Sequence, residues 1–153
     1  MRAIVLFFVM LLSCPLVQVI APPATPTPTP MPSIPPPHVE ISASATTVRV
    51  GETITISGVP VNLGLSIYTL TLSSGASASV SYDDQPRDLP AQDAVFEIVA
   101  AHGEMNRVTF TLRALAPGDA DAILSATGEA RSPQGAFMWS GGASEPLALT
   151  VSE

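Results

Sequence analysis

The sequence predicts an all-β domain in which two antiparallel sheets pack face to face as a β-sandwich. From His38 onward the apolar residues recur with a period of two, which is typical of strands with one buried face. In Arg107–Arg113, for example, Val108, Phe110 and Leu112 alternate with polar residues. Glycine and proline recur between such runs, and no segment of this part shows a helical period over more than one turn.

Nine segments carry the strand pattern, so we expect eight or nine short strands. Glycine and proline positions are expected to be turns, among them Gly58, Gly103, Gly128 and Gly141-Gly142. Asp83–Asp93 fits the pattern least and is expected to be an irregular crossover loop. The expected strands are Val39–Ala43, Thr47–Val50, Thr53–Ser57, Leu65–Leu72, Ala76–Tyr82, Val95–Ala100, Arg107–Arg113, Ala120–Ala126 and Leu147–Val151.

Two stretches combine an alternating strand with a distinctive turn. Val108–Ala120 is an alternating strand followed by the corner Ala116-Pro117-Gly118 and a strand of small residues, and Val48–Ile56 contains a Val-x-Val-Gly-Glu-Thr turn. Both stretches resemble bacterial immunoglobulin-like surface modules. The resemblance spans roughly Val39–Val151. It implies an antiparallel immunoglobulin-like β-sandwich with a role in adhesion, spacing or ligand presentation. It brings no catalytic residues with it.

The first 21 residues are expected to be an export signal or membrane-anchor helix. Arg2 precedes the unbroken apolar run Ala3–Leu12, which has the length of a signal-peptide core. Leu11-Leu12-Ser13-Cys14 resembles a bacterial lipobox, so Cys14 is the candidate lipidation site. Three outcomes stay open: a lipoprotein, an uncleaved anchor, or a cleaved and released protein. Each of them places the domain outside the cytoplasm, at the cell surface or anchored to the membrane.

Residues 22–37 are expected to form a disordered linker rich in proline and threonine. Ten of the sixteen prolines lie between Pro15 and Pro37, including the Thr-Pro repeat that ends at Pro30. Proline excludes regular helix and sheet, so an extended polyproline conformation is what remains. Such a linker reaches roughly 50 Å. The predicted domain order is therefore 1–21 signal or anchor, 22–37 linker and 38–153 β-sandwich.

Charge and composition exclude several classes of function. Thirteen acidic residues stand against six arginines and no lysine, giving a net charge of −7. Nucleic-acid binding requires a basic surface, so no nucleic-acid partner is expected. The sequence holds no nucleophile elbow, phosphate-binding loop or zinc-binding helix motif, and the chain has only two histidines. We therefore expect a protein that is not an enzyme and needs no cofactor.

One acidic segment is the candidate metal site. Asp83, Asp84, Asp88 and Asp93 lie within eleven residues, and clustered carboxylates are ligands that Ca²⁺ prefers. The ordered spacing of an EF-hand is missing. A solvated acidic loop is the alternative interpretation.

The segment around the one tryptophan is the candidate ligand site. Phe137 and Trp139 lie between Pro133-Gln134-Gly135 and Gly141-Gly142. Exposed aromatic residues bind sugar rings or anchor protein interfaces. The alternative is a hairpin strand whose aromatic side chains cap the core. The partner expected at the cell surface is thus a protein or a glycan, with a carbohydrate- or calcium-binding accessory domain as the alternative function.

Overall fold

The described part of the chain is built from β-strands alone. The computed structural model describes residues 35–83, 87–131 and 136–153, and at 87–90, 131 and 137 it describes the backbone alone. Within these residues there are eleven strands and no helix. The strands are β1 His38–Ala43, β2 Thr47–Arg49, β3 Thr53–Val61, β4 Ser66–Leu72, β5 Ser77–Ser81, β6 Arg87–Gln92, β7 Phe96–Glu104, β8 Arg107–Ala114, β9 Gly118–Arg131, β10 Phe137–Ala143 and β11 Leu147–Ser152.

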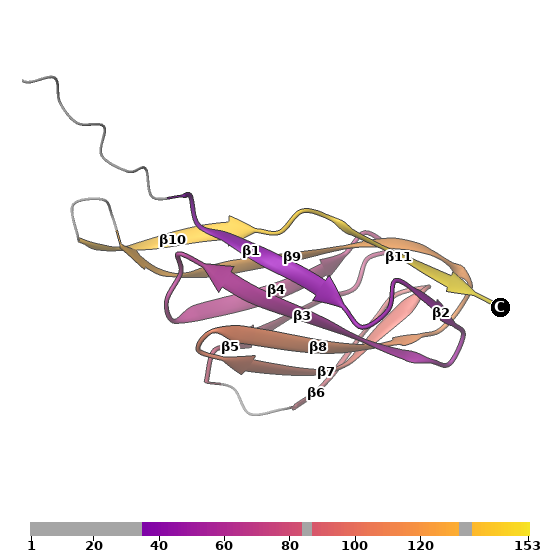
Figure 1. Cartoon of the computed structure of the whole chain (residues 1–153). Coiled ribbons are helices and arrows are strands. Elements are labelled where there is room, and N and C mark those ends of the chain that lie inside the picture. The colour runs from indigo at the N-terminus through magenta and orange to yellow at the C-terminus, as the bar shows by residue number, and fades with distance from the viewer. Residues whose placement is uncertain (1–34, 84–86, 132–135) are drawn as a thin grey trace, which may run out of the picture. The chain divides into compact units, whose positions relative to one another are not determined.

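The strands form two sheets, which Figure 1 shows as layers. The first sheet has the order β1-β3-β8-β7-β6, and the second has the order β2-β11-β9-β4-β5, with β10 paired to β9. Among the described strands only β2 and β11 pair in parallel; the other pairs are antiparallel. β10 and β11 follow one another along the same edge of β9, since β4 occupies its other edge. This all-β, two-sheet architecture is the coarse fold class that the alternation predicted.

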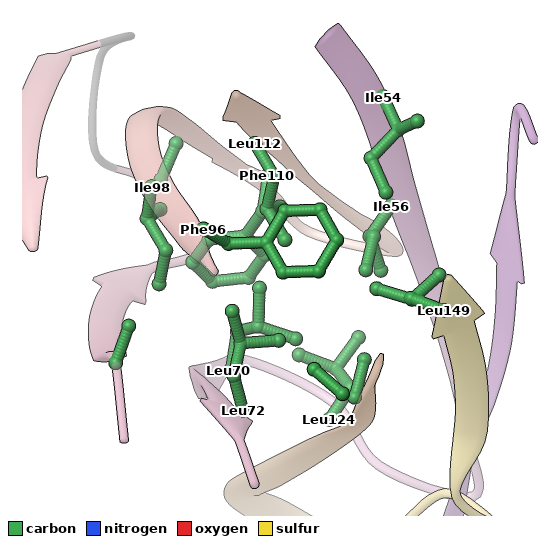
Figure 2. Close-up of a cluster of buried hydrophobic side chains, with 14 of the residues drawn as sticks. Ile54, Ile56, Leu70, Leu72, Phe96, Ile98, Phe110, Leu112, Leu124 and Leu149 are labelled. Atoms are coloured by element: carbon green, nitrogen blue, oxygen red, sulfur yellow. The ribbon is translucent and has the colours of Figure 1, made fainter. Parts of the chain in front are cut away.

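One hydrophobic cluster fills the space between the sheets (Figure 2). The predicted inward residues Val108, Phe110 and Leu112 of β8 have no exposed surface. Leu70 and Leu124 reach the same cluster from β4 and β9 of the other sheet. The burial of these apolar side chains is the main force that holds the two layers together. The largest side chains with under 2% exposure are Tyr68, Phe96, Phe110, Ile54, Ile56, Leu70, Leu72, Ile98, Leu112, Leu124, Leu149 and Val80.

Several glycines predicted to be turns lie inside strands instead. A Cβ at Gly58 of β3 would overlap the Leu124 side chain and lie 3.1 Å from Cγ1 of Val108, so the two sheets approach each other there over a missing side chain. A Cβ at Gly142 of β10 would lie 2.5 Å from the carbonyl oxygen of Pro37. These glycines mark close approaches of other chain segments rather than turns, a role that glycine also has in strands.

The expected crossover loop Asp83–Asp93 is wrong in part, because Arg87–Gln92 forms β6 at the edge of the first sheet. The ladder between β6 and β7 shifts register between Asp88 and Ala91. Pro90 has no amide hydrogen to donate, which confines proline to edge strands and bulges. The interrupted ladder explains why the alternation is not visible in the sequence.

Candidate functional site

The four aspartates of the predicted calcium site have different environments. Asp83 is exposed at the end of the turn after β5, and Asp84 lies outside the described residues. Asp88 belongs to β6, where the structure describes the backbone only. Asp93 is half-buried in the turn between β6 and β7. Among the described side chains, no three of histidine, cysteine, aspartate and glutamate gather in a way that could hold a metal ion.

The Asp93 carboxylate accepts four hydrogen bonds from its own chain. Oδ1 accepts from the amides of Val95 and Phe96, at 2.6 and 2.7 Å. Oδ2 accepts from the Ser74 hydroxyl at 2.5 Å and from the Ala76 amide at 3.1 Å. The first two bonds close the β6–β7 turn, and the other two reach the β4–β5 turn of the opposite sheet. Asp93 thus connects the two sheets at one end of the domain.

The pKa of Asp93 reflects this arrangement. Burial raises the pKa of the carboxyl group, but the hydrogen bonds from Ser74, Phe96, Val95 and Ala76 outweigh burial and hold it below the ordinary value of 3.8. The group is therefore ionised at neutral pH, and its oxygens are already occupied as acceptors. This role is structural, and the aspartate spacing in the sequence did not reveal it.

Trp139 lies on the solvent side of β10 rather than over the core. Its side chain is 68% exposed, and the residue pairs with Glu129 of β9. Met138 points to the opposite face of the strand and is 53% exposed. The side chain of Phe137 is outside the described residues. Because β10 is paired to β9, the backbone that carries the indole is already ordered, whereas the backbone of a loop would have to be ordered on binding.

The outer face of the second sheet is covered by short hydroxyl side chains. We call it the hydroxyl face and define it by Ser125, Thr127, Thr69, Thr71, Ser77 and Ser79 on β9, β4 and β5. These residues share a face because they are cross-strand partners: Thr69 lies opposite both Ser125 and Ser79, and Thr71 lies opposite Ser77. The Oγ1 of Thr69 is 2.8 Å from the Oγ of Ser79, and the Oγ1 of Thr71 is 3.4 Å from the Oγ of Ser77.

The hydroxyl face continues onto β10, where Trp139 ends it. Gly141 lies opposite Thr127, and Ala143 lies opposite Ser125. Trp139 is two residues before Gly141 and therefore on the same side of the strand. The outward hydroxyls are visible in the sequence as Ser and Thr at alternate positions, but their grouping depends on the pairing of distant strands.

A groove of about 520 Å³ follows the edge strand β1. It is lined by prolines 35 and 36, by His38, Val39, Glu40 and Ile41 of β1, and by Ala143 and Glu145. Nδ1 of His38 lies 3.1 Å from the carbonyl oxygen of Pro36, and Nδ2 of Asn62 donates to the carbonyl oxygen of Pro35 at 2.8 Å. The end of the predicted linker thus contacts the domain. The sequence had indicated no groove at this edge.

His102, which precedes the expected turn residue Gly103, lies within β7. Its Nε2 is 3.2 Å from Oε1 of Glu104, two residues along the same strand. The turn itself falls at 105–106, between β7 and β8.

The N-terminal predictions lie outside the described residues. They comprise Cys14, the signal or anchor helix and most of the linker. In the part of the chain that the structure does describe, no helix is long and apolar enough to span a bilayer.

The sequence was also compared with protein-family models and with curated proteins. No family model matches the chain, and no curated protein matches it.

Proposed function

We propose that the chain is an exported, membrane-tethered, non-catalytic immunoglobulin-like module that serves in binding, adhesion or spacing at the cell surface. The observation that carries the proposal is the order of its parts. An apolar N-terminal segment and a proline-rich stretch precede an all-β domain. This order is that of an export signal, a stalk and a presented domain.

The strand order supports the immunoglobulin-like part of the proposal. Immunoglobulin sandwiches pair strands A, B, E and D in one sheet and G, F, C and C′ in the other. Assigning A, B, D and E to β1, β3, β7 and β8 reproduces the first sheet, and assigning C, C′, F and G to β4, β5, β9 and β11 reproduces the second. β2, β6 and β10 are not part of these eight assignments.

The calcium alternative has less support than the carbohydrate alternative. The Asp93 carboxylate is used by four hydrogen bonds within the chain. The exposed indole of Trp139, in contrast, is a surface that a sugar ring can contact.

The experiment is to locate the protein and its N-terminus in cells that produce it. We expect protease added to intact cells, or to spheroplasts, to degrade the domain. We also expect mass spectrometry to find diacylglyceryl-Cys14 or an intact Met1, whereas a new terminus after the apolar segment would identify a released protein and overturn the membrane-tethered part of the proposal. Cys14→Ser changes the terminus and the membrane fraction only in the first case. A domain that resists protease until the cytoplasmic membrane is broken would overturn the proposal.

A further inference from the structure

The hydroxyl face has the chemistry of a surface for uncharged polyols. Each hydroxyl group donates one hydrogen bond and accepts up to two, so Thr69 and Thr71 keep capacity beyond the bonds they make to Ser79 and Ser77. Ile67 and Ile123, which are 48% and 39% exposed on the same outer side, add small apolar areas. Sugar rings present the same combination of hydroxyl edges and apolar faces.

Trp139 supplies an aromatic surface at the edge of this face. Its indole is 68% exposed on a strand that is paired to β9. The next outward residue on β10 is Gly141, and a Cβ there would meet nothing nearer than 3.5 Å. The missing side chain leaves space between the indole and Thr127. A flat ring stacked on the indole therefore has hydroxyl groups within reach on one side.

The distribution of charge favours a neutral ligand. The outward residues of β9 begin and end with a carboxylate, at Asp121 and Glu129, and the three between them are uncharged: Ile123, Ser125 and Thr127. Four of these five residues are exposed, and Ser125 is half-buried. Carboxylates accept hydrogen bonds from sugar hydroxyls but repel anionic polymers. The described residues between them on this side of β9, β4, β5 and β10 carry no charge.

The size of the face argues against a second copy of the chain as the occupant. Four strands about 4.8 Å apart, with about four residues of 3.4 Å along each, cover about 260 Å². A stable protein interface needs about 800 Å² per partner. Two copies would also bring together chains that each carry a net charge of −7. A few sugar rings of one polysaccharide chain, in contrast, fit an area of this size.

We infer that the hydroxyl face binds a neutral polysaccharide chain, with the Trp139 indole stacked on one of its rings. The inference rests on the proposed surface location, because a module at the cell surface meets the polysaccharides that lie outside the membrane. It specifies the partner of the module and the side of the sheet that the partner contacts.

Trp139 is the only tryptophan of the chain, so its fluorescence reports on this site alone. The experiment titrates the full-length protein in mild detergent with hexasaccharides of glucose, mannose and N-acetylglucosamine, and follows tryptophan emission. Pull-down with the corresponding insoluble polymers accompanies the titration. We expect at least one neutral sugar to shift the emission to shorter wavelength with saturation, and an anionic polymer such as polygalacturonate to leave it unchanged.

Variants then locate the site by pull-down, which does not depend on fluorescence. Trp139→Ala and Gly141→Gln are expected to weaken binding at least about tenfold, as for a central contact residue. Met138→Ala is the matched control, since Met138 is exposed on the other face of the same strand, and binding should change less than about twofold. Thermal melting checks that each variant is folded.

The inference would be overturned if no neutral sugar bound, or if the protein preferred the anionic polymer. It would also be overturned if Trp139→Ala and Gly141→Gln left binding unchanged, or if Met138→Ala weakened binding as much as they do. A last refuting result is an emission shift that depends on protein concentration in the absence of sugar. The last result would identify a second copy as the occupant. A protein that is found at the surface but binds no sugar refutes this inference alone, whereas a cytoplasmic protein refutes the proposed function.

Discussion

Asp93→Ala should destabilise the domain far more than removal of an exposed carboxylate such as that of Asp121. The substitution removes the acceptor of four hydrogen bonds and leaves the amides of Ala76, Val95 and Phe96 without that partner. Hydrogen bonds to a charged group contribute about 1.5–3 kcal/mol each when buried. Asp93 is only half-buried, so water replaces part of the loss, and we expect a total of about 3 kcal/mol.

Chemical denaturation at about pH 6 measures this loss as a lower midpoint with an unchanged slope. For a domain of this size the melting temperature should fall by roughly 10 °C. Asp93→Asn keeps one carbonyl oxygen for the amides of Val95 and Phe96 and should lose about half as much. Asp121→Ala is the control, because Asp121 is exposed on β9, and should change the free energy of unfolding by less than about 0.5 kcal/mol.

The reasoning would be refuted if Asp93→Ala were as stable as Asp121→Ala. A second refuting result is a wild-type protein that millimolar Ca²⁺ stabilises while Asp93→Asn shows no such effect. That outcome would mean that Asp93 is a metal ligand instead of a connection between two turns.

Three further predictions follow from the same structure. The pKa of Asp93 is lowered in the folded state, so the stabilisation by its carboxylate is complete above the ordinary value of 3.8 and is lost as the pH falls through the lower folded value. In denaturation across the acid range, the free energies of unfolding of wild type and Asp93→Asn should therefore converge at low pH. A difference that stays constant with pH would contradict this. Gly58→Ala should cost about 1–3 kcal/mol by overpacking against Leu124, and a double-mutant cycle with Leu124→Ala should show coupling, whereas additive losses would exclude that contact. Tyr68→Phe should lower the free energy of unfolding by less than about 1 kcal/mol, since the Tyr68 hydroxyl donates one long hydrogen bond of 3.4 Å to the carbonyl oxygen of Glu104. A larger loss would contradict the weak contribution expected of this bond.

The sequence predicted the fold class because a strand with one buried face carries apolar residues at alternate positions. In β8 the alternation of Val108, Phe110 and Leu112 is a direct consequence of one face being covered, and each of the three is fully buried. The pairing of the strands could not be predicted in this way. Which strand lies beside β8 depends on contacts between residues far apart in the chain, and a single sequence carries no local signal for them.

Two strands at sheet edges, β6 and β10, were not among the nine expected strands, for physical reasons. β6 contains Pro90 and a register shift, so its alternation is broken. β10 contains Gly141 and Gly142, and a pair of glycines in a sequence predicts a turn. Gly142 is nevertheless inside a strand, because the backbone of Pro37 and His38 lies against it.

The candidate sites could also be predicted only in part from the sequence. Asp93 stood out in the sequence as a charged residue among others, but its function follows from the two turns that donate hydrogen bonds to it. The exposure of Trp139 depends on the extension of β9 and β10 along one edge of the sheet. The hydroxyl face was visible in the sequence only as Ser and Thr at alternate positions of separate segments, since its grouping requires the register of four strands.

The parallel pairing of β2 with β11 determines how the domain resists mechanical load. Thr47, Val48 and Arg49 lie opposite Thr150, Val151 and Ser152 in parallel register. The chain enters the domain through β1, so force applied between the two ends of the domain reaches this ladder once β1 has separated from β3. The force then pulls β2 toward its N-terminus and β11 toward its C-terminus, and we expect the hydrogen bonds of the ladder to be loaded together rather than one after another. The parallel ladder is therefore the expected point of resistance once β1 has detached.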